Sequence, residues 1–86
     1  MAVCRVAEEE ILIANVDGQY YAVSNLCSHR GQRLAEGTLR GFELTCPAHG
    51  ARFDMRTGTV LGAPAEEGLK RYPVTVVAGK INVSVG

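Results

Sequence analysis

The sequence has little of several residue types that mark common classes of protein. It contains no tryptophan, two histidines and three cysteines among 86 residues. Three cysteines are too few, and odd in number, for a disulfide scaffold, so we expect a reducing, cytoplasmic compartment. Basic and acidic residues number nine each. A zero net charge gives no support for nucleic-acid binding, which usually needs a basic excess.

Long apolar runs are also missing. No run approaches the roughly 18 residues of a membrane span, and no basic segment precedes an apolar stretch at the N-terminus. We therefore expect no membrane partner and no signal peptide. Apolar residues still make up 47% of the chain, which argues against disorder. The length suits one domain, residues 1–86, which we expect to be a monomer.

Short β-prone runs separated by turn residues fill most of the chain. The runs at 11–16 and 19–23 flank Asp17-Gly18, which is a strong hairpin signal. No segment shows a sustained helical period. Further strands are expected at residues 38–39, 42–45, 59–61, 72–77 and 81–85. Regularly spaced short strands predict an all-β fold, a small antiparallel β sandwich or barrel.

Two short loops each carry one cysteine and one histidine. One residue separates the first pair and two residues separate the second. Thiolates favour iron–sulfur clusters, zinc or copper, and imidazole suits zinc or iron. The two pairs use every histidine in the chain, which a set of unrelated structural residues would rarely do. We therefore predict one metal centre, and its candidate ligands are Cys27, His29, Cys46 and His49.

This donor set leaves two kinds of centre open. Structural zinc also binds two cysteines and two histidines, but zinc fingers usually place both cysteines before both histidines. Here each loop places its cysteine before its histidine. A Rieske-type [2Fe–2S] centre has two cysteines on one iron and two histidines on the other, and the spacing favours it. A structural zinc module for protein binding remains the alternative.

The wider motifs resemble the Rieske ferredoxin components of bacterial ring-hydroxylating dioxygenases. The similar stretches are Cys27-Ser28-His29, Cys46-Pro47-Ala48-His49-Gly50, Ala51-Arg52-Phe53-Asp54, Thr57-Gly58 and Leu69-Lys70-Arg71-Tyr72-Pro73-Val74. The resemblance implies a Rieske-like β base domain with an inserted cluster-binding subdomain at about residues 26–53. It also implies that the two cysteines bind the inner iron and the two histidines bind the outer, exposed iron.

The same resemblance implies a carrier of single electrons and not an enzyme. A terminal oxygenase needs a further iron held by two histidines and a carboxylate. Both histidines here are assigned to the cluster. The expected partners are a flavin-dependent ferredoxin reductase fed by NAD(P)H and a terminal oxygenase. A small Rieske-like subunit of an assimilatory nitrite reductase is the alternative with the same cofactor.

Some positions differ from the respiratory Rieske proteins. Those proteins have a disulfide between the cluster loops, and the matching positions here are Gln32 and Ala48. Cys4 is therefore expected to be a buried or free thiol. Ala51 and Phe53 stand where the respiratory proteins have a serine and a tyrosine hydroxyl donor. Fewer donors to the cluster predict a potential around the low end of the Rieske range, about −150 mV.

Charged residues around the two pairs predict a mildly basic rim. They are Arg30, Arg33, Arg40, Arg52 and Arg56 against Glu36, Glu43 and Asp54. Such a rim would favour an acidic patch on a partner, although a solvated surface is the simpler interpretation.

Overall fold

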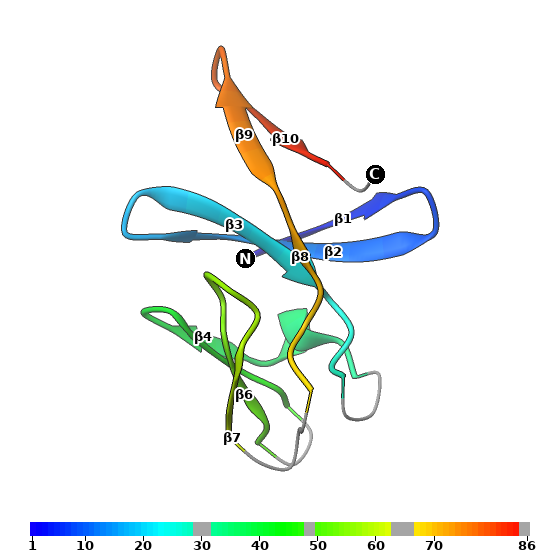
Figure 1. The fold of residues 1–86 in the computed structure, drawn as a ribbon, viewed down its shortest axis with the longest axis vertical. Coiled ribbons are helices and arrows are strands. Elements are labelled where there is room, and N and C mark those ends of the chain that lie inside the picture. The colour runs from blue at the N-terminus through cyan, green and yellow to red at the C-terminus, as the bar shows by residue number, and fades with distance from the viewer. Residues whose placement is uncertain (29–31, 48–49, 63–66, 85–86) are drawn as a thin grey trace.

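Three β layers follow one another along the longest axis of the computed structural model (Figure 1). A four-stranded middle sheet lies between an upper hairpin and a four-stranded lower sheet. The structure describes residues 1–28, 32–47, 50–62 and 67–84. Every strand pairing in these residues is antiparallel. The predicted all-β class is therefore confirmed. No helix in the described part is long and apolar enough to cross a membrane.

The middle sheet contains the strands that the sequence predicted best. Its order is β1-β2-β3-β8, formed by β1 (Ala2–Val6), β2 (Glu9–Val16), β3 (Gln19–Ser24) and β8 (Arg71–Tyr72). Asp17 and Gly18 form the turn between β2 and β3, with φ of 52° and 85°. Positive φ at both positions matches the twist of a two-residue hairpin. Alternation along β2 sends Leu12 to one face of the sheet and Ile11 to the other.

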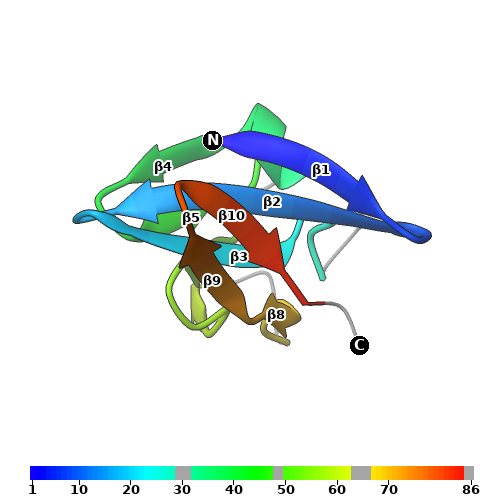
Figure 2. The same ribbon diagram turned by 90° about the horizontal axis from the view of Figure 1, so that it is seen from above.

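The upper hairpin consists of β9 (Val74–Val77) and β10 (Lys80–Val83) and lies across β3 when seen from above (Figure 2). The single strand predicted at 72–77 is wrong, because Pro73 divides it. Tyr72 pairs with Ala22 in the middle sheet, whereas Val74 pairs with Val83 in the hairpin. Proline has no N–H to donate to a ladder, so the chain changes sheets at this residue.

The lower sheet is made of four strands of three residues each. They are β4 (Thr38–Arg40), β5 (Glu43–Thr45), β6 (Arg52–Asp54) and β7 (Val60–Gly62), and a 3-10 helix, η1 (Leu34–Glu36), precedes them. The strand predicted from residue 42 begins at Glu43, because Gly41 and Phe42 form the turn. This sheet continues past residue 53, and the division of residues 1–86 into base and insert stays a prediction.

The main core lies between the middle and lower sheets. It is built from fully buried apolar side chains of both sheets and of η1, including Leu12, Val23, Leu34, Leu44 and Phe53. A second, smaller cluster of Ile11, Ala22 and Tyr72 lies on the opposite face of the middle sheet, with Val74 and Val83 of the upper hairpin packed against it. The two candidate cysteine ligands belong to the main core.

Candidate metal centre

Two thiols from different loops are buried in the main core. Cys27 follows β3, and Cys46 follows β5 directly. Their exposed fractions are 3% and 2%, and both pack in one cluster with Leu34 and Phe53. Two soft donors brought from separate loops into one water-poor region suit a shared iron–sulfur centre. The described half of the predicted donor set therefore fits a cluster of this kind.

Each thiol begins a loop that closes on itself. In the first loop, Cys27–Gln32, the Cys27 N–H donates to the Gln32 carbonyl at 2.8 Å. In the second loop, Cys46–Ala51, the Cys46 N–H donates to the Ala51 carbonyl at 2.7 Å. Gly50 has a φ of 71°, the positive value expected of a glycine after the second histidine. Each ligand pair therefore belongs to one short, closed loop.

Both predicted histidine ligands, His29 and His49, lie outside the described residues, as do Arg30 and Ala48. Their role as ligands of the outer iron stays a prediction. In the described ranges 1–28, 32–47, 50–62 and 67–84, no three His, Cys, Asp or Glu side chains form a metal-binding group.

Residues 67–70 lie beside the first loop and the end of β3. The Ser28 hydroxyl donates to the Glu67 carbonyl at 2.5 Å, and the Ser24 N–H donates to the Lys70 carbonyl at 2.9 Å. Residues 67–70 therefore hold the start of the first loop and the end of β3 from outside.

Ion pairs engage part of the predicted basic rim. Three of its arginines have carboxylate partners: Arg33 with Glu10 at 3.2 Å, Arg52 with Glu43 at 3.6 Å and Arg56 with Asp54 at 3.0 Å. The hydrogen bond from the last arginine holds the pKa of its carboxylate partner below the usual value. Large apolar side chains are exposed beside the loops, at Leu26 (43%) and Leu61 (40%). A partner at this end would therefore meet exposed apolar side chains as well as charged ones.

The two positions predicted to lack hydroxyl donors lie in the second loop and the strand after it. Ala51 and Phe53 are both fully buried in the main core. The predicted absence of hydroxyls therefore concerns the region that contains both thiols. Sequence reasoning missed a polar residue just before the first loop, Asn25, which is also fully buried. Its only sequence signal is its place two residues before Cys27.

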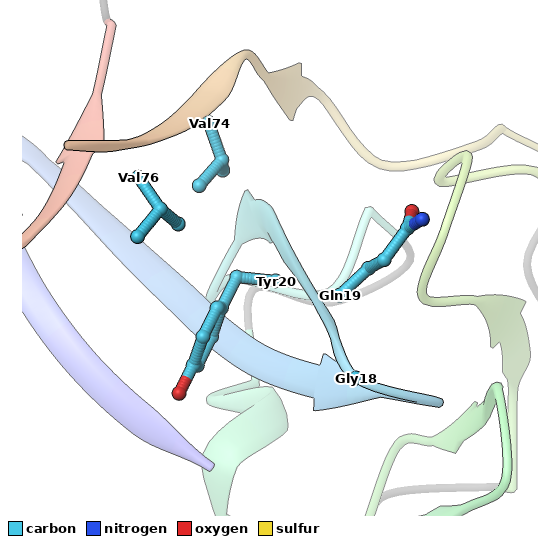
Figure 3. Close-up of a pocket in the computed structure, with 5 residues that line it drawn as sticks. All are labelled: Gly18, Gln19, Tyr20, Val74 and Val76. Carbon is cyan, nitrogen blue, oxygen red and sulfur yellow. The ribbon is translucent and has the colours of Figure 1, made fainter. Parts of the chain in front are cut away.

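A separate hollow lies in the other half of the molecule, between the start of β3 and β9. Figure 3 shows Val74 and Val76 on β9 beside the ring of Tyr20, with the amide of Gln19 pointing away from them. Gly18 completes its lining. None of these side chains carries a thiol, imidazole or carboxylate, so this hollow is not a metal site.

Comparison with known protein families and curated proteins gives consistent results. The Rieske [2Fe–2S] domain family matches residues 1–73. The ferredoxin component of the naphthalene 1,2-dioxygenase system of Pseudomonas aeruginosa is 38% identical over 80 residues, which cover 93% of this chain and 77% of that protein. The ferredoxin component of the p-cumate 2,3-dioxygenase system of Pseudomonas putida is 42% identical over 93 residues, covering 94% and 79%.

Solved structures show the same likeness. The ferredoxin of carbazole 1,9a-dioxygenase from Nocardioides aromaticivorans IC177 superposes with a TM-score of 0.92 at 33% identity, covering 96% of this chain and 82% of that one. A ferredoxin in a complex of reduced oxygenase and oxidized ferredoxin in carbazole 1,9a-dioxygenase gives a TM-score of 0.89 at 34% identity, covering 95% and 84%. The fold and the motifs therefore point to the same group of proteins.

Proposed function

Because this chain belongs to the Rieske [2Fe–2S] family, among the ferredoxin components of bacterial aromatic ring-hydroxylating dioxygenases, we propose that its two cysteine–histidine loops hold its one cluster. The proposed ligands are Cys27, His29, Cys46 and His49. By this assignment the two thiolates bind the buried iron and the two imidazoles bind the outer iron. The observation that supports it most is the burial of two thiols from separate loops in one core.

When bound, such a cluster takes up and releases one electron, and neutral histidine ligands raise its potential above that of a four-cysteine cluster. The chain is the electron carrier of a dioxygenase system and not its catalytic subunit. We propose that a flavin-dependent ferredoxin reductase fed by NAD(P)H supplies the electron and that a terminal oxygenase accepts it. The relatives favour this carrier over the nitrite reductase subunit and the zinc module.

The end of the molecule that contains the loops is the proposed docking surface for both partners. Electrons cross a protein interface over the shortest path, and the exposed Leu26 and Leu61 flank these loops. Because three of the five rim arginines are paired, we expect association with the oxygenase to depend weakly on salt. Stopped-flow reoxidation of the reduced protein by an oxygenase at low and high salt measures this directly.

The cofactor and its ligands are tested together. The aerobically purified protein should contain about two irons and two acid-labile sulfides per chain. Cys27→Ser and Cys46→Ser should each abolish the visible spectrum and the electron paramagnetic resonance (EPR) signal of the reduced protein. Cys4→Ser is the matched control, because Cys4 lies in β1 on the far side of the middle sheet and should leave both unchanged. One zinc without sulfide, or a bleached Cys4→Ser variant, would refute the assignment.

A further inference from the structure

Asn25 is the most deeply buried polar side chain of the described residues, with 1% of its surface exposed. Burying an amide costs free energy unless its hydrogen bonds are made. Here the side-chain Nδ2 donates to Glu10 Oε1 at 3.0 Å, and Oδ1 accepts from the Ala35 N–H at 2.9 Å. The backbone N–H donates to the Glu10 carbonyl at 3.0 Å, and the carbonyl accepts from the Leu34 N–H at 2.7 Å. Asn25 therefore joins three parts of the chain.

These hydrogen bonds join the chain just before the first loop to the chain just after it, and we call this junction the neck of the loop. Asn25 lies two residues before Cys27, and its partners Leu34 and Ala35 follow the loop directly. Inside this neck, Leu26 forms a β-bridge with Arg33, and the Cys27 N–H donates to the carbonyl at the other end of the loop, that of Gln32. The position of the Cys27 thiolate therefore depends on a ring of hydrogen bonds that Asn25 completes.

Glu10 ties this neck to the middle sheet. It belongs to β2, and its side chain is 16% exposed. Its carboxylate also forms ion pairs with Arg33 at 3.2 Å and with Arg5 at 3.7 Å. The hydrogen bond from Asn25 holds the pKa of Glu10 below its usual value, and the two arginines act in the same direction. An ionised acceptor strengthens the bond to the buried amide.

The other end of the same segment touches the second loop. A Cβ atom on Gly37 would lie 1.9 Å from the Thr45 carbonyl oxygen and 3.1 Å from Pro47 Cδ. Only glycine allows this approach. Because Leu34 and Ala35 lie just before Gly37, Asn25 acts on a segment that abuts the residues on either side of Cys46.

We infer that Asn25 is a positioning residue, which fixes the Cys27 thiolate relative to the Cys46 thiolate and thereby sets the environment of the cluster. This inference rests on the proposed ligand assignment. Residues that hold metal ligands from behind usually change metal affinity about 10–100-fold when replaced.

The test exchanges the amide and the carboxylate between the two residues of the Asn25–Glu10 hydrogen bond. Asn25→Asp puts two carboxylates together, so we expect shifted g-values in the EPR spectrum of the reduced protein. Cluster release to an iron chelator should be about 10-fold faster or more. Asn25→Asp combined with Glu10→Gln restores one donor and one acceptor with the polarity reversed. It should recover the wild-type g-values and most of the retention.

A matched control separates positioning from general stability. Asp54→Asn also changes a buried polar residue, but the Asp54–Arg56 pair lies at the opposite end of β6 from the second loop, so it should lower the thermal midpoint without moving the g-values. Unchanged g-values and cluster retention in Asn25→Asp, or the same changes in Asp54→Asn, would overturn the inference.

If Asn25→Asp does not fold, Glu10→Ala provides the same test from outside the loop, because it removes the acceptor of the buried amide. The same shift in g-values supports the inference, and wild-type g-values overturn it. A wild-type protein without a [2Fe–2S] spectrum would instead refute the proposed function.

Discussion

In the middle sheet, β2 forms six residue pairs with β3 and five with β1, whereas every strand of the lower sheet has only three residues. The middle sheet is therefore held by long backbone ladders. The lower sheet and its loops depend on buried side chains, on Asn25 and on the close approach at Gly37. The difference shows that the half with the ligands has the less regular backbone and most of the core, so its integrity should depend on packing and on the cluster.

Truncating one large side chain in each of the two core clusters, Phe53 in the main core and Ile11 in the smaller one, tests this difference most strongly. Phe53→Ala should cost about 3–5 kcal/mol and Ile11→Ala about 2–5 kcal/mol in the free energy of unfolding, because both side chains are fully buried. Only Phe53→Ala should also speed cluster release to a chelator, since Phe53 packs in the core with both thiols. Chemical denaturation and chelator kinetics measure the two effects. Equal release rates in both variants would contradict the comparison.

A pair of glycines gives the next largest effect. Gly37→Ala forces a Cβ against the Thr45 carbonyl, and we expect a loss of about 3 kcal/mol with altered cluster spectra. Gly18→Ala meets no atom within 4 Å and is strained only by its φ of 85°, so about 1–2 kcal/mol should be lost with unchanged spectra. Thermal unfolding with visible circular dichroism distinguishes them. A spectral change in Gly18→Ala would show that the two halves are not independent.

An introduced hydroxyl should change the reduction potential only where it lies in the core that contains the two thiols. Ala51→Ser adds a donor in the core that contains both thiols, and it should raise the potential by roughly 50–100 mV. Ala22→Ser adds the same group on the other face of the middle sheet and should leave the potential unchanged. Voltammetry on both variants and the wild type decides this. A wild-type potential above about +100 mV would refute the predicted low potential.

The smallest expected effect concerns alkaline pH and the upper face of the middle sheet. Burial, with a hydrogen bond to Glu9 at 2.9 Å, raises the pKa of Tyr72 to about 12. The folded pKa is above the ordinary value of about 10, so the stabilisation is complete below pH 10 and disappears as the pH rises toward 12.

Tyr72→Phe should lose about 1 kcal/mol at neutral pH and flatten this alkaline decline, as measured by denaturation at several pH values. Tyr20→Phe replaces a tyrosine that is 40% exposed and is the matched control. A decline that persists in Tyr72→Phe would assign it to another group.

Local patterns predicted β2 and β3 of the middle sheet well, because alternation and an Asp17-Gly18 turn are properties of neighbouring residues. The same patterns missed β6, where one apolar residue lies between two charged ones. They also missed β1, whose partly buried side chains pack against residues of other strands. They also joined β8 to β9, because the apolar run continues across Pro73.

For the site, residue types and spacing predicted that Cys27 and Cys46 would come together, and both thiols are found in one core. The role of Asn25 could not be predicted, since its partners Glu10 and Ala35 are distant in sequence. Two ion pairs of the rim were missed for the same reason, because Arg33 and Arg52 pair with carboxylates on other strands. The roles of all four ligands and the cytoplasmic location stay predictions.

The pairing of Ala22 with Tyr72 has a consequence for the order in which the chain folds. The hairpins of the middle sheet and the upper hairpin close over a few residues and form within microseconds. Joining β3 to β8 must close a loop that contains both cysteines, which costs more chain entropy and is slower. A cluster bound to Cys27 and Cys46 would shorten that loop before β8 pairs with β3. Iron and sulfide supply during synthesis should therefore speed the final folding step as well as fill the site.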